Sequence, residues 1–244
     1  MVMKRISDKR VFVLVCLNAA IYVLIVFLDT MSAARGVTEA QGLLCDCMKY
    51  AAIVSCLCVC LFALKSEKQK SERRKTARIQ AIVFCFTLVA DALLLFTPYF
   101  AAGVIAFLGA HTCALIRYRR DWLLRAGVCA AALFFLALLL MPKLLRADWP
   151  LTLVVAVCAA YSVLIISVTV STFHAEQPRQ NTVFSRVGML LFLACDINVA
   201  LFNGLPAGAP LHTASIVLMW FFYLPAQTLL ALSATTLPLL RPKE

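Results

Sequence analysis

Eight long apolar runs divide this chain, and they limit its fold more than any other feature. They lie near residues 11–28, 49–64, 79–96, 99–116, 122–140, 151–170, 184–202 and 213–237. An α-helix needs roughly 20 apolar residues to cross the hydrocarbon core of a bilayer. Hydrophobic residues make up 63% of the chain and charged residues 14%, whereas a soluble domain is about half apolar and a quarter charged. We therefore expect an all-α, polytopic membrane helix bundle with about eight transmembrane helices.

The start of the chain resembles a signal peptide, because the basic segment 1–10 precedes the first run and Ser32-Ala33-Ala34 follows it. The first run is longer than the apolar core of a signal peptide, which has about 7–15 residues, so we expect it to stay as the first helix. Its removal would leave seven helices. We find no soluble domain or internal repeat, and expect residues 1–244 to form a single integral membrane domain.

Prolines indicate several helix boundaries. Thr97-Pro98 divides the third run from the fourth, which predicts a tight hairpin with Thr97 as the N-cap and Pro98 at the first helical position. Pro142 is expected to end the fifth helix and Pro150 to begin the sixth. Pro225 lies inside the eighth run, where a proline is expected to kink a membrane helix rather than end it.

The basic residues predict the orientation. Nineteen of the 23 lysines and arginines lie in segments that share a side with the amino terminus, and the other four are Arg35, Lys49, Lys143 and Arg146. Since Lys and Arg accumulate on the cytoplasmic side, we expect a multi-pass protein of the cell membrane with both termini cytoplasmic. The basic loop 65–78 would then touch acidic headgroups. The net charge of +11, which in a soluble chain would suggest nucleic acid, follows from this topology, and no nucleic-acid partner is expected.

Eleven cysteines are spread along the chain, most of them inside the apolar runs. There a thiol behaves as a small apolar group with a weak hydrogen-bond donor. Their number is odd, and Cys56, Cys58 and Cys60 follow a C-x-C-x-C spacing on a predicted helix, so neither a disulfide framework nor a zinc site is indicated. No metal and no other cofactor are expected.

Few polar residues lie inside the runs, and the charged ones need a reason, because a charge at mid-membrane costs roughly 2.5–3.5 kcal/mol. Asp91 and Asp196 are each five or six residues from the outer end of their runs, roughly 7–9 Å in depth at the helical rise. Lys49, which opens the second run, is expected to reach toward that level or to pair with Asp46 three residues earlier. The other polar residues that we single out as candidates are His111, Asn198, Tyr223 and Gln227.

The two aspartates suggest acid/base chemistry. Two carboxyl groups that face each other in a low dielectric cannot both ionise cheaply. One acid beside one carboxylate can donate and accept protons during a reaction. Alternatively, each aspartate forms hydrogen bonds within the bundle or relays protons in a transporter.

Two blocks of sequence carry short motifs around these aspartates. The first holds Ala90-Asp91 and then a Gly-x-x-Ala-Phe-x-x-x-His motif from Gly103 to His111. The second holds Cys195-Asp196 and then a Tyr-x-x-x-Gln motif from Tyr223 to Gln227. In their order and spacing the motifs resemble the YhhN-type lysoplasmalogenase family, and the similarity also takes in Lys49 and Tyr161. Ala90 stands where that family usually has glycine, and Cys195 where it has a small residue, often serine.

The resemblance implies an eight-helix bundle that hydrolyses the vinyl ether bond of a lysoplasmalogen, releasing a fatty aldehyde and a glycerophospho-alcohol. One carboxyl group would protonate the vinyl ether on carbon, and the other would stabilise the cation and activate water, as in glycosidases. Asp91 and Asp196 would take these roles. Lys49 would neutralise the lipid phosphate or influence a carboxylate. Water and the glycerol part would be oriented by His111, Asn198, Tyr223 and Gln227. The partners would be a lysophospholipid substrate and membrane lipids; the sequence indicates no oligomeric state.

Two other classes of function stay open. A proton-coupled membrane transporter would use the acidic residues as relays, but such proteins commonly carry helices broken by Gly or Pro in both halves of an inverted repeat. Here only the eighth run has an internal proline. A non-catalytic lipid-binding membrane protein would use the same bundle without turnover.

Overall fold

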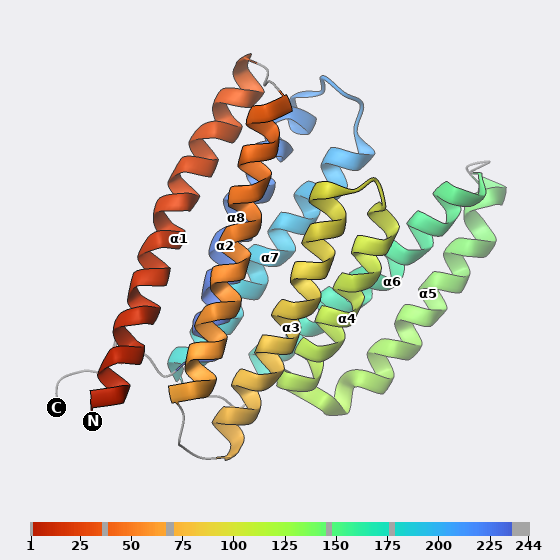
Figure 1. Ribbon diagram of the computed structural model, residues 1–244. Coiled ribbons are helices and arrows are strands. Elements are labelled where there is room, and N and C mark those ends of the chain that lie inside the picture. Colours follow the sequence, from red (N-terminus) through yellow and green to blue (C-terminus); the bar gives the residue numbers. More distant parts are fainter. Residues whose placement is uncertain (1, 36–38, 67–70, 145–147, 176–178, 236–244) are drawn as a thin grey trace. The chain divides into compact units, whose positions relative to one another are not determined.

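The computed structural model describes residues 2–35, 39–66, 71–144, 148–175 and 179–235. These residues form eight α-helices and one 3₁₀ turn, with no β-strand among them (Figure 1). The elements are α1 (Val2–Arg35), α2 (Glu39–Ser66), α3 (Ser71–Phe96), α4 (Phe100–Arg119), η1 (Arg120–Trp122), α5 (Leu123–Leu144), α6 (Trp149–His174), α7 (Arg179–Gly204) and α8 (Pro210–Leu232). The all-α fold expected from the apolar runs is confirmed.

Seven stretches of the described residues are long and apolar enough to cross a membrane. Six of them follow single helices, whereas the stretch Phe100–Lys143 is 44 residues long and runs through α4, η1 and α5. The chain therefore has the helices of a multi-pass membrane protein. Whether the number of crossings is seven or eight depends on whether α4 and α5 cross separately.

The helices extend beyond the apolar runs at most of their ends. α3, for example, begins at Ser71, inside the basic segment that precedes the third run. Lys and Arg are good helix formers, and their long side chains can reach the interface while the backbone stays helical. The apolar runs therefore indicated where the helices lie but underestimated the length of most of them.

The predicted boundary between the third and fourth helices is wrong in detail. α4 begins at Phe100 rather than Pro98, and the side chain of its N-cap residue, Tyr99, makes no capping bond. Thr97 instead donates its hydroxyl to the Leu93 carbonyl oxygen at 2.6 Å, and its oxygen accepts from the Tyr99 amide at 3.2 Å. Thr97 thus closes α3 rather than opening α4.

Of the predictions for the other prolines, the one for Pro142 is wrong and the one for Pro150 is confirmed, while the kink expected at Pro225 stays a prediction. Pro142 does not end α5, because the helix continues to Leu144 and accommodates the proline near its end. Pro150 lies in the first turn of α6, where Asp148 caps the helix by accepting from the Leu151 amide at 3.0 Å. Pro225 lies inside α8 without ending it. α8 ends at Leu232, short of the predicted residue 237; residues 236–244 lie outside the described part.

The chain forms two compact units, and each is described by itself. Unit 1 comprises Met1–Arg78 and Gln177–Glu244, and unit 2 comprises Ile79–Glu176. In unit 1, α8 packs against α7, α1 and α2, and α1 also packs against α2. In unit 2, α6 packs against both α4 and α5.

Glycines allow close helix contacts in both units. A Cβ added to Gly188 of α7 would lie 3.0 Å from Leu230 Cγ and 3.2 Å from the Ala226 carbonyl oxygen of α8. In unit 2, a Cβ on Gly103 of α4 would lie 2.6 Å from Leu94 Cγ of α3. Membrane helices pack through small residues in this way because lipid supplies no hydrophobic force between them. The contacts also define which residues of the paired helices lie at the same level.

A polar side chain in the middle of α1 joins three helices of unit 1. Asn18, which is 6% exposed, places its Nδ2 3.3 Å from both the Ala52 carbonyl oxygen and Cys56 Sγ, and its Oδ1 lies 2.5 Å from Ser55 Oγ. Cys56 Sγ is in turn 4.0 Å from Thr228 Oγ1 of α8. Such bonds between membrane helices contribute about 0.6 kcal/mol on average, so this group helps to hold α1 and α8 on α2.

The close α7–α8 contact can be tested at Gly188. We expect Gly188→Val to lower the free energy of unfolding by about 1–3 kcal/mol, the usual cost of overpacking, because the facing Ala226 carbonyl cannot move aside. The thermal midpoint in detergent measures the change. Gly127→Val in α5 is the control, since a Cβ there meets nothing within 4 Å. Equal destabilisation by the two variants would contradict the role of the contact.

Candidate functional site

Asp91 lies in the interior of unit 2. Its side chain is 4% exposed, and it is five residues from the end of α3, roughly 7–8 Å along the helix axis. The preceding Ala90 is fully buried, and its carbonyl oxygen would be 3.3 Å from a Cβ on Gly103. The first candidate carboxyl group is therefore shielded and sits beside the close contact of α3 with α4.

His111 is buried in the same unit, with 3% of its surface exposed. Its Nε2 lies 3.0 Å from the hydroxyl of Tyr161 on α6, and the rings of Tyr161 and Phe107 flank the imidazole at centroid distances of 5.2 and 6.4 Å. The Gly103–Leu94 contact puts Asp91 level with a residue about five positions before His111, so the two differ in depth by roughly 8 Å. Tyr161 thus fixes the orientation of His111 from a third helix.

Tyr223 and Gln227 share one buried face of α8 in unit 1, since residues four apart lie above one another on a helix. They are 5% and 1% exposed. The Tyr223 ring packs edge-on against Phe192 of α7 and Trp220, at centroid distances of 5.4 and 5.3 Å. Gln227 Nε2 is buried and has no hydrogen-bond acceptor among the described residues. It is a donor positioned in the interior of the unit.

Asp196 and Asn198 lie on α7 of the same unit. The contacts Gly188–Leu230 and Phe192–Tyr223 put Asp196 at about the level of Trp220, one turn from Tyr223. Asp196 is half-buried, and it is eight residues from the end of α7 rather than the six expected from hydropathy. Asn198 is buried and donates its Nδ2 to the Ala194 carbonyl oxygen of its own helix at 2.7 Å.

Lys49 forms a buried charge cluster in unit 1. Its Nζ lies 3.1 Å from Asp29 Oδ1 of α1 and 3.6 Å from Asp46 Oδ1, and it sits 4.7 Å from the centre of the Trp220 ring of α8. The pairing with Asp46 was one of the two arrangements expected for Lys49. Contrary to the sequence interpretation, Lys49 does not open its helix, because α2 begins ten residues earlier at Glu39.

The cluster carries more negative than positive charge. Asp29 and Lys49 side chains are both 9% exposed, while that of Asp46 is 30% exposed. The Cys45 thiol donates a hydrogen bond to Asp29 Oδ1 at 3.4 Å. Asp29 Oδ2 is buried with no hydrogen-bond donor among the described residues. Two carboxylates therefore neutralise the Lys49 ammonium, which reduces its attraction for a phosphate.

Sequence analysis missed Asp29 and Trp220 as neighbours of Lys49. Asp29 directly follows the first apolar run, a position where a charged residue commonly lies at the water interface. A charged residue at the end of one predicted helix and an opposite charge near the start of the next are the signal that could have indicated the pair. Trp220 offered no such signal, because an aromatic residue in a membrane helix more often faces lipid or packs in the core.

The described residues contain no group of three or more His, Cys, Asp or Glu side chains arranged to hold a metal ion. The polar groups available for chemistry are carboxyl, imidazole, phenol and amide groups. Such a set can transfer protons and position water.

Membrane-length helices with a few buried polar side chains define an all-α, multi-pass membrane protein. The chain matches the model of the YhhN family over residues 48–234, which is most of its length. It therefore belongs to the YhhN family, which includes lysoplasmalogenases. No curated protein and no solved structure matches the chain.

The Asp29–Lys49 pair can be tested by removing one partner. We expect Lys49→Met to lower the free energy of unfolding by about 3–5 kcal/mol, because it leaves a buried carboxylate without its counter-ion. Thermal unfolding in detergent measures the loss. The double variant Asp29→Asn/Lys49→Met should be more stable than Lys49→Met alone. Asp121→Asn, which breaks the exposed pair of Arg119 and Asp121, is the control and should change little; a double variant no better than the single one would contradict the pairing.

Proposed function

We propose that this protein is an intramembrane hydrolase that cleaves the vinyl ether bond of a lysoplasmalogen to a fatty aldehyde and a glycerophospho-alcohol. The observation that carries the proposal is Asp91, a carboxyl group only 4% exposed inside a membrane-length helix. The chain belongs to the YhhN family, which includes lysoplasmalogenases. A vinyl ether resists nucleophiles and reacts when an acid protonates its carbon, and an acid shielded from bulk water suits that step.

The proposed reaction uses two carboxyl groups, supplied by Asp91 and Asp196. One, as the acid, transfers its proton to the β-carbon of the vinyl ether and leaves an oxocarbenium ion. The other, as the carboxylate, takes a proton from water while the water oxygen bonds to the cationic carbon, giving a hemiacetal. The hemiacetal hydroxyl then loses its proton, the bond to the glycerol oxygen breaks, and that oxygen gains a proton. Return of a proton from the second carboxyl group to the first restores the enzyme.

The other polar residues have supporting roles in the proposal. Gln227 Nε2, a buried donor, would hold water or a glycerol oxygen, with Tyr223 on the same face of α8 and Asn198 on α7. His111, oriented by Tyr161, would act in the same way from α4. Lys49 is paired with Asp29 and Asp46, so its role is to set the local electrostatic field rather than to bind the lipid phosphate alone. The substrate would enter from the surrounding lipid.

The carboxyl roles are tested by measuring aldehyde release from lysoplasmalogen by the purified protein. Asp91→Asn and Asp196→Asn should each reduce turnover by about 10²–10⁴-fold, the usual contribution of a general acid or base, with thermal midpoints near that of the wild type. Asp148→Asn is the matched control. It keeps a side chain that can cap α6 and should keep full activity.

Three outcomes would contradict the proposal or part of it. Wild-type turnover that survives both substitutions would exclude the acid/base assignment. An absence of turnover on any vinyl ether lysolipid would favour a carrier or a non-catalytic lipid-binding protein. Proton-dependent uptake of a solute by vesicles containing the protein, lost in Asp91→Asn, would favour the transporter.

The proposed topology has eight crossings in the cell membrane with both termini cytoplasmic. A single helix of 44 residues would be about 66 Å long, whereas the hydrocarbon core is about 30 Å thick. The helix is broken at Arg119, whose φ of −149° and ψ of 79° leave the helical region. The exposed ion pair of Arg119 with Asp121, 2.6 Å long, is suited to the water interface. α4 and α5 are therefore proposed to cross separately.

Reporter fusions test this topology. Arg120 and the carboxyl terminus are expected on the cytoplasmic side, so a reporter that works only in the cytoplasm should be active at both. Residues 205–209, between α7 and α8, are expected outside, so a reporter that works only outside should be active there. The physical reason is the bias of Lys and Arg toward the amino-terminal side. An outside signal after Arg120 would contradict the separate crossing of α4 and α5.

A further inference from the structure

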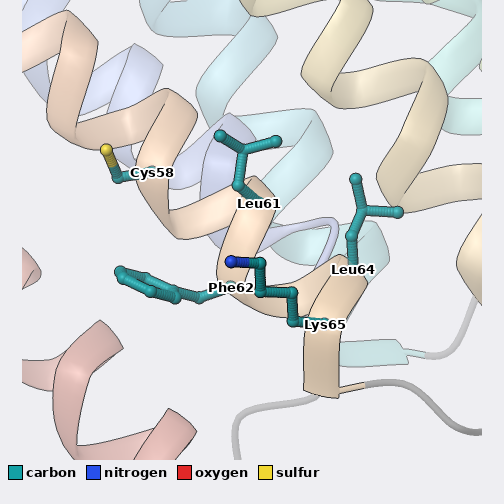
Figure 2. A pocket seen from close by; sticks show the side chains of 5 residues that line it. All are labelled: Cys58, Leu61, Phe62, Leu64 and Lys65. Carbon is teal, nitrogen blue, oxygen red and sulfur yellow. The ribbon is translucent and has the colours of Figure 1, made fainter.

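A groove on α2 is lined by none of the residues proposed for catalysis. It has a volume of about 350 Å³ and is lined by Cys58, Leu61, Phe62, Leu64 and Lys65, all in the last three turns of the helix (Figure 2). Small-molecule pockets in proteins begin at roughly 300 Å³, so the groove can take part of a ligand. Four of its five lining residues are apolar, and Leu61 is 43% exposed. An apolar segment would fit beside them.

One end of the groove is basic. Lys65 is exposed in the last turn of α2, and Figure 2 shows its side chain running along the helix in the direction of Phe62. The guanidinium carbon of Arg10, from α1, lies 5.7 Å from the centre of the Phe62 ring. A cation held over an aromatic ring at this distance gains a modest attraction. Arg10 is therefore positioned beside the groove by a contact within unit 1.

The sequence around this end adds positive charge. Segment 1–10 holds four basic residues and one acidic residue, and segment 65–78 holds seven basic and two acidic residues. Basic side chains next to an apolar surface at the end of membrane helices form the usual recognition pattern for anionic lipid headgroups. A helix of another protein would match the apolar part of the groove, but it would not account for the positive charge at its end.

We propose that this groove binds one anionic phospholipid. Its phosphate lies between Lys65 and Arg10, and the upper part of one acyl chain lies along Leu61 and Phe62 toward Cys58. Seven residues of helix separate Cys58 from Lys65, which gives the chain about 10 Å of contact. The site belongs to the leaflet on the side of the amino terminus. It does not depend on the proposed hydrolase activity, since none of its residues takes part in that chemistry.

The test is lipid retention by the purified protein. The protein is placed in detergent with equal amounts of phosphatidylglycerol and phosphatidylcholine, and the bound lipid is counted by native mass spectrometry. We expect a clear preference for phosphatidylglycerol. Arg10→Gln and Lys65→Gln should each weaken the preference about fivefold, the effect of removing about 1 kcal/mol for one basic residue near a membrane surface. Arg120→Gln, which removes an exposed arginine from unit 2, is the matched control and should have no effect.

A second pair of variants tests the apolar part of the groove. Cys58→Phe fills the groove and should reduce retention of phosphatidylglycerol, whereas Cys58→Ala leaves it open and should not. Thermal midpoints near that of the wild type show that the variants are folded. The proposal is overturned if phosphatidylcholine is retained equally well, or if Arg120→Gln weakens retention as much as Lys65→Gln. It is also overturned if Cys58→Phe retains the lipid fully.

Discussion

Inside a bilayer no water is available to satisfy polar groups, and each part of this fold answers that constraint. Helices satisfy the backbone amides and carbonyls along most of the described residues, which is the only way for an open segment to cross hydrocarbon. Several buried polar side chains are paired in the same way, with partners on neighbouring helices. Asn18 forms hydrogen bonds with Ser55 and Cys56, and His111 forms one with Tyr161. Lys49 forms an ion pair with Asp29.

The pair of Asp29 and Lys49 has a consequence for the whole of unit 1. The family model begins at residue 48, so Lys49 lies within the matched residues and Asp29 lies before them. The helix that precedes the matched part nevertheless supplies a carboxylate for the buried ammonium, and α1 also contacts α8. Asp29 is the closer and more deeply buried of the two carboxylates beside Lys49, so α1 contributes to the charge cluster of unit 1. The same cluster reaches Trp220 and, through that ring, Tyr223.

The two proposals assign different chemistry to different parts of the protein. Hydrolysis of a vinyl ether needs an acid kept from bulk water, and Asp91 is buried within unit 2. Binding of an anionic headgroup needs the opposite, namely exposed positive charge at the edge of the membrane. Lys65 and Arg10 provide this charge beside an apolar groove. Both ligands would be lipids, but different parts of the helices would recognise them.

Much of this protein could be predicted from its sequence. The length and apolar character of the runs determined that the chain forms membrane helices, because a helix is the one structure that satisfies its own backbone in lipid. The i, i+3 spacing of Asp46 and Lys49 indicated their pairing as one of two arrangements, because helical geometry places such residues together, and the two side chains are 3.6 Å apart. Motifs around Asp91, His111, Asp196 and Tyr223 also indicated the family, and the match over residues 48–234 confirmed it.

Other features were decided by the tertiary structure alone. The partner of Lys49 is Asp29, 20 residues away on another helix, and the contacts of Trp220 and Tyr161 come from helices far along the chain. No local pattern specifies such pairs, since they depend on how each helix is rotated and at what depth it packs. The end of α3 is a different case, because local bonds of Thr97 to Leu93 and Tyr99 mark it. The apolar runs thus determined that the helices exist. Packing decided which polar residues on different helices meet, because such a pair depends on the rotation and depth of both helices.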